Sequence, residues 1–156
     1  MTYTEVYPRT VQELEPYLQF MYDSLIQIAD ERRANTKITR SAFFRVCLFC
    51  LQTSTQESPK IIVLLDGINP IGYGMYFENT PWWETKKVGL IYAVYVPGDN
   101  PRACALMLDR CMQSACNGGM RIVETYARRF NAAAFRYYEK RHGFKMNAYV
   151  FRKELE

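Results

Sequence analysis

The segment that covers residues 88–127 constrains the fold of this chain more than any other part of the sequence. Residues 88–96 are apolar and rich in β-branched and aromatic side chains, which is typical of a buried strand. Residues 101–117 show helical spacing and are followed by Gly118 and Gly119, and residues 121–127 have the composition of a second strand. Because a strand–helix–strand connection of this length makes a right-handed crossover, we expect the two strands to be parallel neighbours.

The remaining segments predict one mixed α/β domain over residues 1–156. Thr10, with Glu13 three residues later, is typical of a helix start, and Asp66-Gly67 and Asn69-Pro70 are turn sequences within a hairpin. The further elements expected are a strand at 2–7, helices at 11–33 and 38–51, hairpin strands at 61–65 and 71–77, a helix from Asn131 to Gly143 and a strand at 144–152. The order β-α-α-β-β-β-α-β-α-β predicts a mostly antiparallel sheet of about six strands with helices on both faces.

The composition argues against several classes of function. The net charge of +4 is small, and no dense Lys/Arg run contains interleaved aromatic residues, so nucleic acid is not an expected partner. Five cysteines, an odd number among apolar neighbours, indicate free buried thiols, and a single histidine, His142, excludes a His-pair metal site. We expect no metal. The sequence has neither an apolar run of membrane-spanning length nor an N-terminal signal sequence, so we expect a cytoplasmic protein without membrane contact.

The joint between the strand at 88–96 and the following helix has the sequence of an anion site. Asn100 is a suitable N-cap, and Pro101 suits the first helical position. Backbone N–H groups at a helix start attract phosphates, and we expect about three or four of them to be free here. Ala103 and Ala105, however, stand where phosphate-binding loops usually have glycines. The joint is therefore either a phosphate site or only the capped start of a structural helix.

Two segments together resemble the GNAT superfamily of acetyl-CoA-dependent N-acetyltransferases. They are the joint just described and NAAAFRYYEKRHGF at residues 131–144, which resembles the N-x-x-A…Y-E-K-x-G-F ending of that family. The predicted element order also matches the family fold along nearly the whole chain. The resemblance implies that the strands at 88–96 and 121–127 splay apart and that acetyl-CoA, the co-substrate, lies between them. The implied reaction is acetyl transfer to an amine of a small molecule or a protein.

The resemblance also implies which residues bind the cofactor. Backbone groups of Val94, Tyr95 and Val96 would bond the pantetheine arm, and Asn131 would contact it unless it serves only as a helix N-cap. The family's pyrophosphate motif, Q/R-x-x-G-x-G/A, falls on residues 100–105, with its contacts at Asn100, Arg102, Ala103, Cys104 and Ala105. The sequence departs from the motif at Asn100 and Ala103. Alanine adds a methyl group where glycine leaves room, and Arg102 is expected to compensate as a phosphate partner.

Acid–base chemistry is expected from a tyrosine and a carboxylate. The resemblance implies that Tyr138 protonates the leaving thiolate, since a phenol with a pKa of about 10 stays protonated at neutral pH. The spacing from Tyr138 to Gly143 is one residue longer than the family pattern, and Tyr137 takes this role if the extra residue does not lie at the helix end. Glu124 is the expected base and Glu78 is a second candidate, and a solvated surface carboxylate is the alternative reading of each.

Two adjacent tryptophans indicate a second hypothesis for the function. Trp82 and Trp83, in NTPWWET after the hairpin, are typical of a substrate lip or a protein contact, and packing over the sheet edge is the alternative. If the altered pyrophosphate motif no longer binds acetyl-CoA, the chain is a catalytically inactive GNAT-like domain with a structural or protein-binding role, for example in a phage or another assembly. Oligomers are compatible with both hypotheses. The acceptor is not encoded in a readable motif, because the loops that shape it vary freely in such folds.

Overall fold

The computed structural model describes residues 3–31, 38–96, 100–125 and 143–145, together with positions 138, 140, 153 and 155. The chain divides into two compact units, Met1–Tyr126 and Ala127–Glu156. The helices and strands of known bounds all belong to the first unit. The helix predicted from Asn131 and most of the strand predicted at 144–152 lie outside the described residues.

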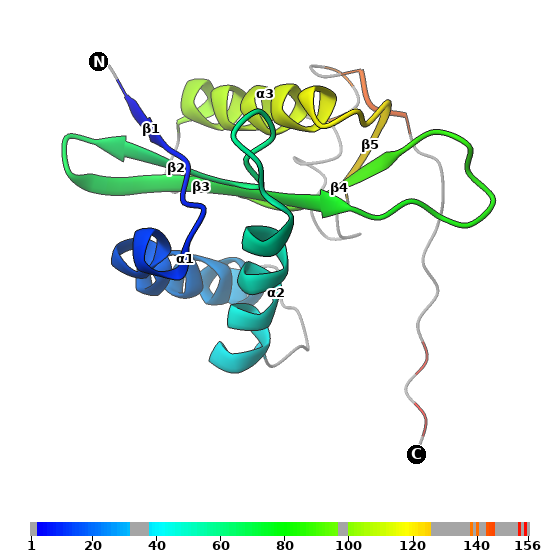
Figure 1. Ribbon diagram of the computed structural model, residues 1–156. Helices are drawn as coiled ribbons and strands as arrows, with labels where there is room; N and C mark the ends of the chain where they lie inside the picture. Colours follow the sequence, from blue (N-terminus) through cyan, green and yellow to red (C-terminus); the bar gives the residue numbers. More distant parts are fainter. Residues whose placement is uncertain are drawn as a thin grey trace. The chain divides into compact units, whose positions relative to one another are not determined.

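The first unit contains a five-stranded sheet in the order β1-β2-β3-β4-β5 (Figure 1). The strands are β1 (Thr4–Val6), β2 (Ile61–Asp66), β3 (Asn69–Glu78), β4 (Val88–Tyr95) and β5 (Ile122–Thr125). Every neighbouring pair is antiparallel except β4 and β5, which run parallel. The parallel pair predicted from the crossover and the hairpin formed by β2 and β3 are thus confirmed. The structure agrees with the predicted mixed, mostly antiparallel class.

Helices cover both faces of this sheet, as predicted. α1 (Val11–Glu31) and α2 (Arg40–Thr53) lie on one face, and α3 (Pro101–Asn117) lies on the other (Figure 1). α1 begins where expected, because the Oγ1 atom of Thr10 accepts a hydrogen bond of 3.2 Å from the N–H of Glu13. α2 begins two residues later than predicted. The Oγ1 atom of Thr39 accepts the N–H of Ala42 at 3.1 Å, which makes Thr39 the N-cap.

The strand β3 shows how closely the layers pack. Tyr73 and Met75 are buried on the face toward α1 and α2, in the main apolar cluster. Gly74 lies on the other face, against α3. A Cβ atom added to Gly74 would lie 2.5 Å from the Sγ atom of Cys111 and 3.0 Å from the Sδ atom of Met107. Because such contacts are too short for carbon and sulfur, only glycine allows α3 to lie this close to the strand.

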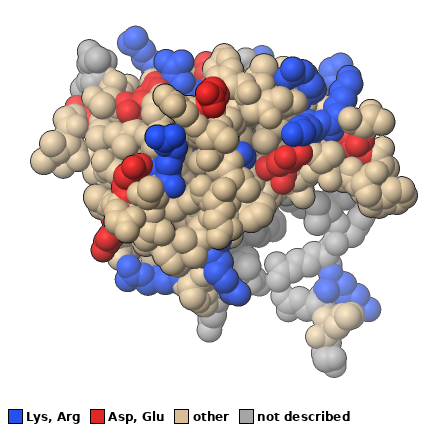
Figure 2. All heavy atoms as spheres, in the orientation of Figure 1, with Lys and Arg blue, Asp and Glu red and all other residues tan. Residues whose placement is uncertain are grey.

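The surface and the thiols agree in part with the predictions from composition. Figure 2 shows Lys and Arg side chains interspersed with Asp and Glu on the face in view. Cys47, Cys50 and Cys111 are buried, and burial raises the pKa of each thiol to about 12. The prediction of buried thiols is wrong for Cys116, which is exposed near the end of α3.

In the described part of the chain, no group of three or more His, Cys, Asp or Glu side chains is arranged to hold a metal ion. Within the same residues, no helix is both long and apolar enough to span a membrane.

Candidate functional site

The described pairing of β4 with β5 covers the first half of β4, and the residues that follow Thr125 lie outside the described ranges. The paired residues run from Val88 with Ile122 to Ile91 with Thr125, whereas β4 continues to Tyr95. The pairing of β4 with β3 shifts by one residue at the same place, so that Tyr92 is the extra residue of a β-bulge. A bulge bends its strand and changes the direction of its backbone groups. The bulge therefore redirects the backbone of β4 at the start of its second half. The predicted splaying of β4 from the strand at 121–127 concerns residues beyond Thr125, which lie outside the described ranges, so it stays a prediction.

The residues predicted to bond the pantetheine arm follow this bulge. Val94 and Val96 are half-buried, and Tyr95 is buried. The hydroxyl of Tyr95 donates a hydrogen bond of 3.1 Å to the Oε1 atom of Gln27 in α1, and its ring lies 6.2 Å from that of Tyr73. The side chain of Tyr95 thus fixes β4 against α1.

Asn100 occupies the start of α3 with two hydrogen bonds. Its Oδ1 atom accepts the N–H of Ala103 at 3.1 Å, and its Nδ2 atom donates to the hydroxyl of Tyr3 at 2.9 Å. The carbonyl of Asn100 accepts the N–H of Cys104 at 3.1 Å. Pro101 has no N–H group, so in the described first turn only the N–H of Arg102 lacks an acceptor. Asn100 is the predicted N-cap, but the prediction of three or four free N–H groups is wrong.

The other residues of the pyrophosphate motif have different environments. Ala103 is 0% exposed, so its methyl group is enclosed by protein and does not stand on the open surface of the helix start. Arg102 is exposed, and Cys104 and Ala105 are half-buried. The substitution of alanine for glycine at position 103 therefore places no bulk on the solvent side. The group that competes with an anion at this helix start is the side chain of Asn100, for which the sequence analysis predicted both an N-cap and a pyrophosphate contact.

The two candidate bases are not equivalent. Glu124 is half-buried in β5 and pairs with Leu90, one position before the last described pair of β4 and β5. Glu78 is exposed at the end of β3, where its Oε1 atom accepts a hydrogen bond of 3.3 Å from Thr80 Oγ1. Of the two carboxylates, Glu124 is the one whose paired residue in β4, Leu90, lies two positions before the bulge at Tyr92.

Tyr138 belongs to the second unit and is half-buried. Its carbonyl accepts the N–H of Phe144 at 3.0 Å, and the two rings lie 5.4 Å apart in an edge-to-face arrangement. Tyr138 and Lys140 are π-helical, and Gly143 has a φ of 67°, as expected for a glycine just after a helix. The position of the extra residue of the motif depends on residues outside the described ranges, so the choice between Tyr138 and Tyr137 stays a prediction. Tyr137 and Asn131 lie outside the described residues.

Two aromatic features complete the description of the candidate site. Trp82 is 92% exposed and Trp83 is 68% exposed, and their rings form an edge-to-face pair 5.5 Å apart. The expected surface position is confirmed, and packing over the sheet edge is excluded. Tyr92, the bulge residue, was not a predicted site residue, because a bulge leaves no signal in this sequence. It is 39% exposed and lies 6.2 Å from the ring of Phe77.

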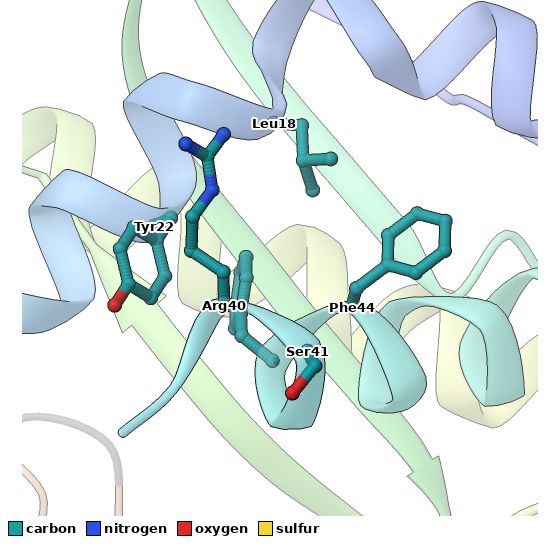
Figure 3. Close-up of a pocket in the computed structure, with 6 residues that line it drawn as sticks. Leu18, Tyr22, Arg40, Ser41 and Phe44 are labelled. Atoms are coloured by element: carbon teal, nitrogen blue, oxygen red, sulfur yellow. The ribbon is translucent and has the colours of Figure 1, made fainter. Parts of the chain in front are cut away.

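A small apolar cavity of about 220 Å³ separates α1 from α2 (Figure 3). Leu18 and Tyr22 line it from α1, while Arg40, Ser41 and Phe44 line it from α2 (Figure 3). The guanidinium of Arg40 lies 5.7 Å from the centre of the Tyr22 ring, which is a cation–π contact. None of the residues that line this cavity belongs to β4 or to α3.

Comparison with known proteins identifies the fold. No family model matches the chain, and no curated protein matches it. Glucosamine-6-phosphate N-acetyltransferase from Arabidopsis thaliana is 14% identical, with a TM-score of 0.64 over 100% of both chains. An aminoglycoside acetyltransferase from an uncultured soil metagenomic sample, solved with sisomicin, is 13% identical, with a TM-score of 0.64 over 99% of this chain and 96% of that one. A transcriptional regulator from Bacillus halodurans is 15% identical, with a TM-score of 0.69 over 99% of this chain and 100% of that one. The chain therefore has the fold of the GNAT acetyltransferases.

Proposed function

We propose that this protein is an acetyl-CoA-dependent N-acetyltransferase that acetylates an amine of a small molecule or a protein. The observation that carries the proposal is the bulge at Tyr92 in the middle of β4, in a chain with the fold of the GNAT acetyltransferases. α3 begins six residues after Tyr95, the last residue of β4, which with its neighbours Val94 and Val96 is proposed to bond the pantetheine amides. A strand edge next to a helix N-terminus supplies backbone groups for an amide-containing arm and for a diphosphate.

The described residues at the start of α3 fit the diphosphate of acetyl-CoA if the side chain of Asn100 releases the N–H of Ala103. The N–H and the exposed side chain of Arg102 are available to a phosphate, and Cys104 and Ala105 lie on the next part of the same turn. The N–H of Ala103 becomes available only when Asn100 releases it. Backbone groups of Val94, Tyr95 and Val96 would bond the arm, and Asn131 is proposed to contact it. Binding of the diphosphate is thus coupled to opening of the Asn100 cap.

The reaction needs a neutral amine, a donor for the oxyanion and a proton for the leaving thiolate. The amine nitrogen bonds to the thioester carbonyl carbon, and the carbon–sulfur bond breaks. We assign removal of the amine proton to Glu124, directly or through water, and protonation of the thiolate to Tyr138. A backbone N–H at the bulge of β4 would stabilise the oxyanion, because a bulge leaves backbone groups that do not pair within the sheet.

Ligand binding and turnover test this proposal separately. Acetyl-CoA at about 100 times its dissociation constant should stabilise the protein by about 2.7 kcal/mol, and no rise in the melting temperature at millimolar acetyl-CoA would refute the proposal. Tyr138→Phe should lower kcat by about 100-fold or more without changing the affinity for acetyl-CoA, because general acids contribute at least this factor. Tyr137→Phe is the matched control. Equal rates for wild type and Tyr138→Phe would remove Tyr138 from the mechanism.

A second candidate function is a catalytically inactive domain that binds another protein. Two observations favour it: the cap that Asn100 places on the helix start, and the exposure of both Trp82 and Trp83. In this case the indole pair is the contact surface, because large exposed aromatic side chains are enriched in interfaces. The double change Trp82→Ser and Trp83→Ser should then abolish the association of this protein with its protein partner in size-exclusion chromatography. It should leave the circular dichroism spectrum of the protein unchanged. Association that survives the double change would count against this function.

A further inference from the structure

A second and larger cavity lies at the C-terminal end of α3. Its volume is about 530 Å³, which is within the range of small-molecule sites. The residues that line it come from the end of α2, the loop before β2, the β3–β4 connection and the turn after α3: Phe49, Thr53, Thr55, Ser58, Lys60, Glu78, Thr80, Lys87, Gly118 and Met120. α3 has 17 residues and is therefore about 25 Å long, so this cavity is remote from the helix start at Asn100.

Hydrogen bonds fix the wall of this cavity. The Oγ atom of Ser58 lies 2.7 Å from the hydroxyl of Tyr76 and donates to the carbonyl of Ser114 at 2.9 Å. The N–H of Ser58 donates to Thr55 Oγ1 at 3.0 Å. In the β3–β4 connection, the N–H of Val88 donates to Thr80 Oγ1 at 3.0 Å. Bonds of this kind hold the loops in one arrangement before any ligand arrives.

Lys60 is the most buried charged residue that lines the cavity. It is only 7% exposed, and its Nζ atom donates a hydrogen bond of 2.8 Å to the carbonyl of Thr53. The ammonium also lies 5.7 Å from the centre of the Tyr76 ring. An ammonium group has further N–H donors, and no other acceptor for them is present among the described side chains and backbone groups. Burial lowers the pKa of Lys60, and the negative charge of Glu78 opposes this effect.

The charges of the lining favour an anion. Lys60 and Lys87 contribute two positive charges and Glu78 one negative charge, so the lining carries a net charge of +1. Glu78 already accepts a hydrogen bond from Thr80 Oγ1. We propose that this cavity binds a small molecule through an anionic group, a carboxylate or a phosphate, held between Lys60 and Lys87. Such a group would accept the remaining N–H donors of a buried cation and replace the water that burial removes from it.

Titration with inorganic phosphate and, separately, with succinate tests this site at constant ionic strength. Amide resonances of Ser58, Thr80 and Gly118 should shift in ¹H–¹⁵N spectra, and the pKa of Lys60 should rise when the anion binds. Lys87→Gln should weaken binding by roughly two- to fivefold, the effect of one exposed charge. Lys86→Gln is the matched control, because this neighbouring lysine does not line the cavity and should leave binding unchanged. The two probes distinguish recognition of phosphate from recognition of carboxylate.

Two results would overturn the site. One is the absence of shifts at these amides with both probes, including the case in which only residues near Arg102 respond. The other is equal affinity in wild type and Lys87→Gln.

Lys60→Met, if it folds, should weaken binding by about tenfold or more, since it removes a charge-assisted hydrogen bond in a buried position. Unchanged binding in this variant would show that Lys60 only caps the end of α2. The site does not depend on acetyltransferase activity, so the two proposals fail independently.

Discussion

Removing the Asn100 cap should tighten the binding of acetyl-CoA. In the structure, the Oδ1 atom of Asn100 occupies the N–H of Ala103 at 3.1 Å, so a diphosphate that uses this N–H must first displace the side chain. An Asn N-cap contributes about 0.5–2 kcal/mol relative to alanine. Asn100→Ala removes this competition, and the gain in affinity should therefore be about 2- to 30-fold.

The same substitution should lower the stability of the protein without ligand. The cap accounts for about 0.5–2 kcal/mol of this loss, and the hydrogen bond from Asn100 Nδ2 to the hydroxyl of Tyr3 adds about 0.5–1.5 kcal/mol. Since 1 kcal/mol shifts the melting temperature by about 2–4 °C in a protein of this size, the expected decrease is about 2–14 °C. Tighter binding together with lower stability is a combination that general unfolding does not produce.

Isothermal titration calorimetry with CoA and acetyl-CoA measures the affinity, and differential scanning calorimetry measures the stability. Thr39→Ala is the matched control, because Thr39 caps α2 in the same way through the N–H of Ala42 at 3.1 Å. It should lower the melting temperature and leave the dissociation constant unchanged. An unchanged or weaker affinity in Asn100→Ala would refute the reasoning, since it would show that the diphosphate does not use the N–H of Ala103.

Three further predictions concern the core. Tyr76→Phe removes a hydroxyl that bonds to two serine side chains, at 2.7 and 2.6 Å, and should lower the free energy of unfolding by about 1–3 kcal/mol. Tyr73→Phe removes a buried hydroxyl without a partner among the described residues, so it should be neutral or stabilising. Urea unfolding compares the two variants, and an equal loss of stability in both would contradict this reasoning. Gly74→Ala should lower the free energy of unfolding by about 1–3 kcal/mol, because its Cβ would lie 2.5 Å from the Sγ atom of Cys111; a melting temperature equal to that of wild type would exclude this overlap. Burial raises the pKa of the Cys111 thiol from 9.0 to about 12, so between these pH values the folded state keeps a proton that the unfolded state loses, and the free energy of unfolding should fall as the pH rises from about 9 to 12. Cys111→Ala should make this fall shallower when urea unfolding is measured at several pH values. An identical pH dependence of stability in wild type and variant would show that the thiol does not contribute.

Local signals in the sequence predicted most of the elements. Turn residues between two apolar runs located the hairpin of β2 and β3, and the length of the crossover predicted the parallel pair of β4 and β5. The cap residues Thr10 and Asn100 were recognised for the same reason, because their hydrogen bonds join residues three apart in the chain. The start of α2 was placed two residues early, because Ile38 continues the apolar pattern although Thr39 ends the extended segment.

The candidate site was predicted less completely. The sequence placed Asn100, Arg102 and Ala103 at the start of α3 and indicated Asn100 as the N-cap, but it did not show that the Nδ2 atom of Asn100 reaches Tyr3 or that Ala103 is fully enclosed. The first of these facts depends on a partner far away in the chain, and the second depends on burial by several elements. The same holds for the bulge at Tyr92, where the register of β3 against β4 decides which residue has no partner.

The sequence alone determined what depends on neighbouring residues: the order of strands and helices, their caps and turns, and the candidate residues at the start of α3. These features follow from backbone preferences and from hydrogen bonds over a few residues, which a local pattern encodes. Only the tertiary structure decided that β4 has a bulge at Tyr92 and that Lys60 is buried in a cavity formed by four segments. Contacts between residues far apart in the chain depend on how the layers pack, and packing depends on shape and volume, which no local pattern contains.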